Sequence, residues 1–127
     1  MKDFSYRLLK KTLDVSSLRQ RTISSNIANF NTPDYKANKV VFEELLSKTK
    51  DEIRLKKTHH KHFGIDSLDD IDIKAKKKNT TSLNDNGNNV DIDLEMTELA
   101  ANEIYYGTLI RQINSRLSNL NYVINKT

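Results

Sequence analysis

Apolar residues recur at a strict heptad spacing along the C-terminal part of the chain. From Ile92 to Ile124 they follow one another at alternating steps of four and three residues, with Glu103 the single charged member. A 3.5-residue period is typical of a helix whose apolar seam packs against another helix. We expect one continuous helix, about 50 Å long at roughly 1.5 Å per residue. The seam consists of Ile92, Met96, Leu99, Glu103, Tyr106, Ile110, Ile113, Leu117, Leu120 and Ile124.

The charges on this helix are ordered along its length. Acidic residues lie near its start and basic residues lie towards its end, an order that complements the helix macrodipole. The acidic residues are Asp91, Asp93, Glu95 and Glu98, and the basic ones are Arg111, Arg116 and Lys126.

The N-terminal segment, from about Asp3 to Ile27, also has helical spacing of apolar residues. Asp3 is the expected N-cap. Two neighbouring stripes give the helix a broad apolar face, wide enough for one partner inside the chain and another outside. The first stripe is Phe4, Leu8, Val15, Leu18 and Thr22, and the second is Leu9, Leu13, Ile23 and Ile27.

An asparagine-rich segment follows this helix and contains the only proline of the chain. Because Pro33 biases Thr32 away from helical geometry, the helix should end by about 29–31. The segment has more polar residues than helix termination requires, so we expect it to make defined contacts, with its amides bonding backbone groups that the helix leaves unpaired. The residues concerned are Asn26, Asn29, Asn31, Thr32, Pro33, Tyr35 and Lys36.

The middle of the chain differs in kind from the two ends. Residues 40–46 could form a short strand or one helical turn, whereas 53–55 and 71–73 alternate like short strands. Four asparagines and a glycine in 84–89 indicate a turn or mobile loop. Little here could bury a core, so we expect a small β-containing excursion or a partly disordered arm.

These patterns predict a mainly α protein in which the long terminal helices pair as a coiled-coil-like layer around a small irregular or β-containing middle. Residues 1–31 form the N-terminal amphipathic helix, 32–90 the turn and basic middle segment, and 91–127 the heptad helix; both termini build one assembly domain. A two-helix pair leaves apolar surface exposed, which marks a site of association. We therefore expect a marginal monomer that is ordered by polymerisation. An ordinary intramolecular core or a simple coiled-coil dimer are the alternatives.

The basic charge excess has a defined location, and it raises nucleic-acid binding as the alternative function. Residues 48–78 carry ten Lys/Arg and six Asp/Glu, while the remainder carries eleven of each. Acidic residues interrupt this stretch and Phe63 is its only aromatic residue, so the interpretation of 74–78 as a solvated charge run is favoured over a nucleic-acid site.

Other chemistry finds little support in the residues. His59, His60 and His62 could ligate a metal together with Asp66, but the neighbouring lysines would repel a cation, and a solvated basic loop is favoured. No catalytic motif or Gly-rich phosphate loop is present, so we expect neither an enzyme nor a cofactor or metal. The chain has no cysteine, no apolar run of the roughly 20 residues that span a bilayer, and no N-terminal pattern of a cleaved signal.

Two phrases of the sequence carry a family resemblance. The segment 26–36, Asn-Ile-Ala-Asn-Phe-Asn-Thr-Pro-Asp-Tyr-Lys, resembles the signature of the bacterial flagellar basal-body rod and hook proteins. The phrase 87–96, Gly-Asn-Asn-Val-Asp-Ile-Asp-Leu-Glu-Met, is similar to that of the proximal rod proteins, as are the short length and Thr58 followed by His62. The resemblance covers roughly 5–46 and 85–125. One departure is Asp34, because the family usually has Gly there. Asp suits a type I turn or tolerates the left-handed region.

The resemblance implies a structural subunit of the rod, the shaft that transmits torque from the membrane ring to the hook and is needed for motility. It implies self-association in a helical rod, contacts with other rod proteins and with membrane-ring or adaptor components, and passage through the flagellar type III export apparatus without a cleaved signal peptide. The location implied is the basal body, outside the cytoplasmic membrane, with neither nucleic-acid binding nor direct membrane insertion. The expected assembly residues are Leu8, Val15, Leu18, Ile23, Ile27, Met96, Leu99, Tyr106, Ile110, Ile113, Leu117, Leu120 and Ile124.

Overall fold

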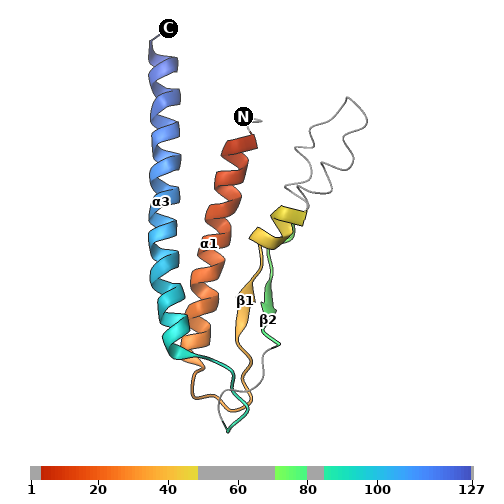
Figure 1. Cartoon of the computed structure of the whole chain (residues 1–127). Coiled ribbons are helices and arrows are strands. Elements are labelled where there is room, and N and C mark those ends of the chain that lie inside the picture. The colour runs from red at the N-terminus through yellow and green to blue at the C-terminus, as the bar shows by residue number, and fades with distance from the viewer. Residues whose placement is uncertain (1–3, 49–70, 80–84, 127) are drawn as a thin grey trace, which may run out of the picture.

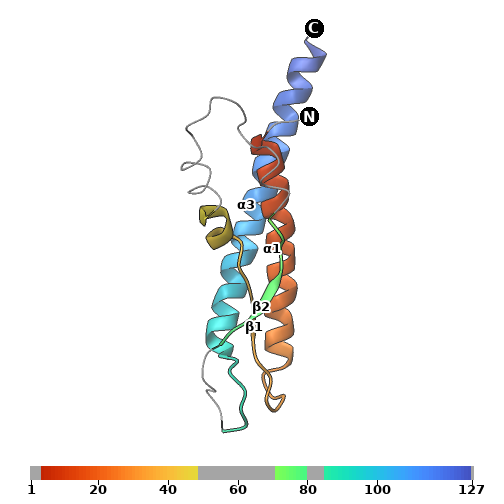
Figure 2. The same cartoon turned by 90° about the vertical axis from the view of Figure 1, so that its right-hand side faces the viewer.

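Two long helices lie side by side in a computed structural model of the chain, which describes residues 4–48, 71–79 and 85–126. The elements are α1 (Phe4–Ala28), β1 (Asn38–Val40), β2 (Ala75–Lys77) and α3 (Ile92–Asn125). The helices run in opposite directions, and α1 packs against α3 and against both strands (Figures 1 and 2). The predicted mainly helical fold with paired terminal helices and a small strand-containing middle is confirmed.

Helix α1 ends just before 29–31, the range by which the sequence predicts its end. It runs to Ala28, and the next turn continues with Asn29 N–H donating to the Ser25 carbonyl at 3.1 Å and Phe30 N–H donating to that of Ile27 at 3.2 Å. Val15 and Ile23 of the apolar stripes are buried, whereas Phe4 at the start of the first stripe is exposed. The expected N-cap Asp3 lies outside the described residues.

The strands form a two-stranded antiparallel ladder in which Asn38 is opposite Lys77, Lys39 opposite Lys76 and Val40 opposite Ala75. The prediction of a strand at 71–73 is wrong, because the ladder begins at Ala75. The isoleucines at 71 and 73 instead turn towards the core, and this burial explains their alternation with Asp72. The predicted strand at 53–55 lies outside the described residues.

Residues 40–46 combine both of the structures that their pattern allowed. Val40 is the last residue of β1, and 43–48 form a short helix. Between them Phe42 is buried and packs with Val15, Val40 and Ile71 in the hydrophobic core. The expectation that the middle segment could bury little core is therefore wrong, because three of these four residues come from it. Val40 and Phe42 are close in the sequence, whereas Ile71 and Val15 come from distant segments, so the cluster forms only in the folded chain.

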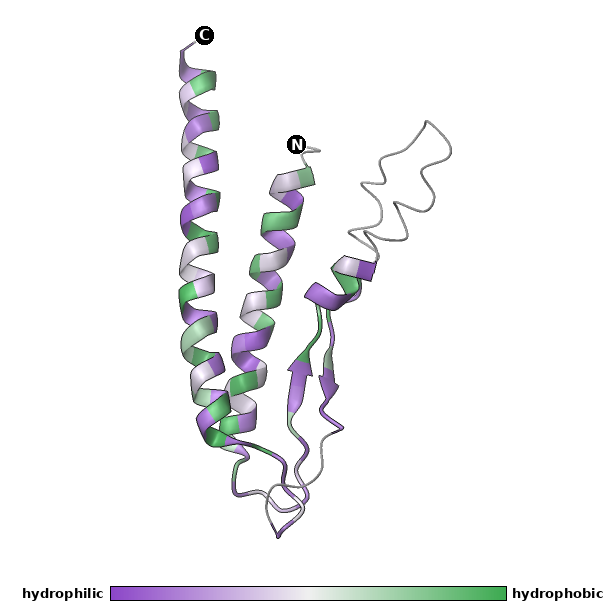
Figure 3. Cartoon of the chain, viewed as in Figure 1, coloured by the Kyte–Doolittle hydropathy of each residue, from purple (hydrophilic) through white to green (hydrophobic). Residues whose placement is uncertain are grey.

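Helix α3 confirms the continuous helix expected from the heptads. The Asp91 carboxylate caps it by accepting from Asp93 N–H at 3.1 Å and Leu94 N–H at 3.2 Å. With 34 residues against 25 in α1, it extends beyond the start of α1, and hydrophobic residues continue along this extension (Figures 1 and 3). No described helix has the length and apolarity that crossing a membrane requires.

Candidate assembly site

The Asn26 side chain joins the end of α1 to three other segments. It is fully buried, and its Nδ2 donates to the Asn38 carbonyl at 2.8 Å and to the Glu95 carboxylate at 3.0 Å. Its Oδ1 accepts from Asn38 N–H at 2.9 Å and from the Tyr35 hydroxyl at 3.2 Å. The amide thus pairs with the backbone of β1 as another strand would, and anchors β1 to α1.

Two further asparagines complete the connection from the side of α3. Asn88 Nδ2 donates to the carbonyls of Asn29 at 2.9 Å and Thr32 at 2.8 Å, which closes the turn after α1. Asn89 Oδ1 accepts from Ala37 N–H at 2.7 Å. Both side chains are buried. We call the set Asn26, Tyr35, Asn38, Asn88 and Asn89 the asparagine clasp.

The turn at the tip of the clasp retains left-handed geometry without a glycine. Asp34 has φ 58°, and Tyr35 N–H donates to the Thr32 carbonyl at 3.3 Å. With Pro33 at the second position, these are the features of a type II turn. Of the two conformations open to Asp34, the structure has the left-handed one. Asp34 N–H also donates to the Asn86 carbonyl at 2.9 Å, which ties the turn to the segment before α3.

A buried ion pair lies beside the clasp. Lys78 Nζ and Glu95 Oε1 are 2.9 Å apart, and the Glu95 side chain is 1% exposed. The sequence indicated only that Glu95 complements the helix dipole. Its structural role depends on a lysine that follows β2 and on an asparagine of α1, and helical spacing carries no signal of either.

Polar contacts continue along the interface between the two helices. Asn102 is buried and donates to the Ser16 carbonyl at 3.0 Å and to Gln20 Oε1 at 2.8 Å, while Ser16 Oγ donates back to Asn102 Oδ1 at 3.0 Å. The α1-facing line of α3 therefore passes through Glu95, Asn102 and Leu109, at every seventh residue. It lies beside the heptad seam rather than along it.

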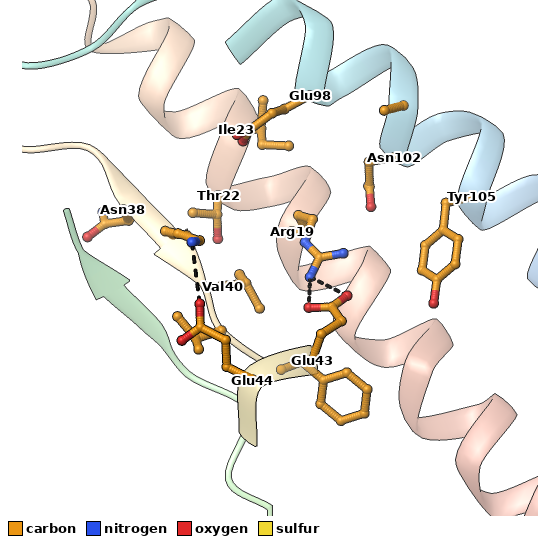
Figure 4. Close-up of a pocket in the computed structure, with 14 residues that line it drawn as sticks. Arg19, Thr22, Ile23, Asn38, Val40, Glu43, Glu44, Glu98, Asn102 and Tyr105 are labelled. Atoms are coloured by element: carbon orange, nitrogen blue, oxygen red, sulfur yellow. Dashed lines mark hydrogen bonds and ion pairs between the residues drawn. The ribbon is translucent and has the colours of Figure 1, made fainter. Parts of the chain in front are cut away.

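A groove of about 560 Å³ opens between α3, α1, β1 and the short helix 43–48 that follows β1 (Figure 4). Arg19 donates to both oxygens of Glu43 across it, at 2.9 and 2.8 Å. Burial raises the pKa of the Glu43 carboxyl, but the hydrogen bond and charge of Arg19 together with backbone hydrogen bonds outweigh burial, so this pKa lies below its ordinary value. Burial and the Glu43 charge raise the pKa of the Tyr105 phenol on the α3 wall.

Comparison with known proteins places the chain in a family. The family described as flagella basal body rod protein matches residues 12–36, which span most of α1 and the turn. The chain is 38% identical to the flagellar basal body rod protein FlgB of Bacillus subtilis (strain 168), over 91% of this chain and 89% of that protein. It is 42% identical to FlgB of Borreliella burgdorferi, over 82% and 80%, and 34% identical to FlgB of Borrelia hermsii, over 96% of each. The chain belongs to the FlgB family of flagellar basal body rod proteins.

The turn residues that carry the FlgB-family resemblance have two different environments. Asn26 is buried and Tyr35 is half-buried in the clasp, and Lys36 Nζ donates to the Gly87 carbonyl. Asn29 Nδ2 donates to the Ser25 carbonyl at 2.8 Å, a backbone bond of the expected kind. Of the seven residues predicted to make defined contacts, the exposed ones are Asn31, Thr32 and Pro33.

The expected assembly residues of this FlgB-family chain divide in the same way. On α1 all of them are buried or half-buried: Leu8, Val15, Leu18, Ile23 and Ile27. On α3 one set is half-buried: Leu99, Ile110, Ile113 and Leu120. The other set is exposed: Met96, Tyr106, Leu117 and Ile124. The exposed set leaves apolar side chains at the surface of the described part of the chain.

Several clasp residues were not singled out from the sequence as site residues. Lys78, which lies beside the clasp, was interpreted as part of the charge run 74–78, and Asn38 carries no local pattern. Asn88 and Asn89 were assigned to a turn or loop. Their place two and three residues before the Asp91 cap, inside the phrase that resembles the FlgB family, was the available signal.

The basic run 74–78 is divided between two environments. Lys78 is bonded to buried Glu95, whereas Lys76 and Lys77 are exposed on the strand ladder. Lys74 pairs with Asp72, which raises the pKa of this exposed lysine. The histidines 59, 60 and 62 lie outside the described residues, within which no cluster of metal-ligating side chains occurs.

Proposed function

We propose that this chain is a structural subunit of the flagellar basal body rod that polymerises through its terminal helices. Membership of the FlgB family supports the rod role. The observation that supports polymerisation is the exposed apolar set of α3, Met96, Tyr106, Leu117 and Ile124. Surface of this kind on a soluble domain marks association.

The clasp supplies the rigidity that such a subunit needs. It fixes the end of α1 against β1 and the start of α3 through buried hydrogen bonds from Asn26, Asn88 and Asn89. Buried polar groups are stable only when their bonds are made, so they favour one arrangement of the segments over others. We infer that the clasp orients α1 and α3, and that both termini together form the assembly domain.

The finer assignment follows the family. In our proposal the subunit lies in the proximal rod, outside the cytoplasmic membrane, and transmits torque from the membrane ring to the hook. Its partners are further copies, other rod proteins, ring or adaptor components, and the type III export apparatus, which it passes without a cleaved signal. The proposal includes no catalytic role, in line with the rod-protein relatives. The relatives give no support to the nucleic-acid alternative.

Leu117→Asp tests polymerisation, because it places a charge on the exposed apolar set. Since Leu117 is 46% exposed, the isolated chain should keep its helix content by circular dichroism. Burial of an unpaired carboxylate between subunits is costly, so rod incorporation and swimming should both be lost. Ser118→Asp is the matched control, because it adds the same charge at the next, exposed position. Normal motility of the Leu117→Asp strain would contradict the proposal.

A further inference from the structure

The end of α3 has apolar residues that stay largely exposed among the described residues, although Lys126 Nζ lies 4.4 Å from the centre of the Tyr122 ring. The C-terminal end of α3 extends beyond the start of α1 (Figure 1), and we call residues 121–126 at this end the overhang. Tyr122, Val123 and Ile124 are consecutive and all exposed. Because successive residues are about 100° apart round a helix, these three side chains point in three directions. A surface apolar over so wide an arc fits a site between neighbouring molecules.

The groove of Figure 4 offers a complementary surface at the other half of the same helix. Its α3 wall presents Ala101 and the exposed ring of Tyr105, and the opposite wall is β1 with the short helix that follows. Tyr105 and Val123 are 18 residues apart, which is five full turns of an α-helix. They therefore lie on the same face of α3.

The charge of α3 is segregated between these two halves. Residues 92–110 contain four acidic and no basic residues, whereas 111–126 contain three basic and no acidic ones. A second copy displaced by 18 residues along the helix would bring Arg116 level with Glu98, and Arg111 level with Asp93. The displacement that aligns Val123 with Tyr105 thus also aligns opposite charges.

We propose that the overhang of one copy lies in the groove of a second copy, with the two α3 helices parallel and staggered by about 18 residues, or roughly 27 Å at 1.5 Å per residue. This inference rests on the proposed function and defines its subunit contact. Such a contact is heterologous: each added copy presents a new overhang and leaves a groove free, so the assembly propagates.

A cysteine pair tests this stagger directly, because the natural chain has no cysteine. In Tyr105→Cys/Val123→Cys the two sulfur atoms are on one helix, roughly 27 Å apart. A disulfide needs Cα atoms within about 7 Å, so every bond formed must join two molecules. Mild oxidation of the concentrated full-length protein should give a ladder of dimers, trimers and longer species on a non-reducing gel. Each single-cysteine variant should remain largely monomeric.

Ala100→Cys/Val123→Cys is the matched control. Position 100 is exposed but lies about 140° round the helix from position 105, so it should give at most a tenth of the ladder yield. Glu98→Arg in the Tyr105/Val123 pair should lower the yield at least fivefold, and adding Arg116→Glu should restore it. No ladder, an equal ladder from the control pair, or dimers from Tyr105→Cys alone would overturn the stagger.

The outcome is separable from that of the rod proposal. Absence of the ladder combined with loss of motility in Leu117→Asp would leave the rod subunit standing and remove only this contact. A ladder from purified protein whose Leu117→Asp strain swims normally would support the contact and contradict polymerisation as the basis of function.

Discussion

At the end of the molecule where α1 stops and α3 begins, buried amides and one ion pair join four segments. At the opposite end α3 carries exposed apolar side chains over its last turns. The first region is satisfied within the chain, since among the described residues no buried side-chain nitrogen or oxygen lacks a hydrogen bond. The second leaves apolar side chains exposed in the part of the chain that the structure describes. The contrast suggests a subunit whose shape is set internally at one end and whose assembly is set at the other.

The largest loss in the free energy of unfolding should come from Asn26→Ala. The change leaves the Asn38 backbone groups and the Tyr35 hydroxyl without a partner in a buried site. At about 1–3 kcal/mol for each unsatisfied group, we expect a loss of about 4 kcal/mol in the free energy of unfolding. Urea titration followed by circular dichroism measures it. Asn29→Ala is the control, since half-buried Asn29 should cost below about 1.5 kcal/mol. Equal losses of stability in Asn26→Ala and Asn29→Ala would contradict a special role of the clasp in stability.

Glu95→Ala should give the second-largest loss in the free energy of unfolding. The change leaves Lys78, which is 17% exposed, without its carboxylate partner. Removal of one partner from a buried ion pair costs about 3–5 kcal/mol, and we expect about 3. The double variant Glu95→Met/Lys78→Met should be more stable than Glu95→Ala alone, since it leaves no buried charge. Thermal unfolding of the two proteins compares them. A double variant less stable than the single one would show that the ion pair itself, rather than charge burial, dominates.

Gly87→Ala should cost about 2 kcal/mol, because Gly87 has φ +80° and an added Cβ would lie 2.2 Å from Asp34 Oδ1. In an Asp34→Gly background the carboxylate is absent, so part of this cost should disappear. A double-mutant cycle measured by urea unfolding gives the coupling. Strict additivity would mean that the cost comes from the positive φ alone.

A substitution at the exposed C-terminal end of α3 should change the free energy of unfolding much less than one in the clasp. Ile124 is 69% exposed, so Ile124→Ser should alter the free energy of unfolding of the isolated chain by no more than about 0.5 kcal/mol. Urea unfolding of Asn26→Ala and Ile124→Ser under the same conditions compares the two ends of the molecule quantitatively. A loss above 1 kcal/mol for Ile124→Ser would indicate that the overhang is packed within its own chain.

The smallest expected effect on stability is the pH dependence that Glu43 contributes at the rim of the groove. Because its folded pKa lies below the ordinary 4.5, its contribution to stability is present above about pH 4.5 and is lost as pH falls through the lowered value. The side chain is 59% exposed, so solvent screening limits the effect to below about 0.5 kcal/mol. Glu43→Gln should flatten the unfolding profile between pH 5 and 3 more than Glu44→Gln does. Identical profiles would exclude a role for the Arg19 pair.

The helices and their ends could be predicted because their signals are local. The heptads placed α3 from Ile92, and Pro33 placed the end of α1 to within a few residues. The strand at 75–77 could not be predicted, since its lysines have no β pattern and it forms only because β1 lies opposite. The isoleucines nearby gave the stronger strand signal, but their alternation reflects burial against the core.

The sequence by itself determined two long amphipathic helices, a turn between them and an excess of apolar surface, because period and spacing act over neighbouring residues. Only the tertiary structure decided that Asn26 pairs with β1 and that Glu95 meets Lys78. These two contacts join residues 12 and 17 positions apart, and the bond from Asn26 to Glu95 joins residues 69 positions apart. A buried polar side chain is stable only where all its partners converge, and that convergence depends on the packing of α1, α3 and the strands together.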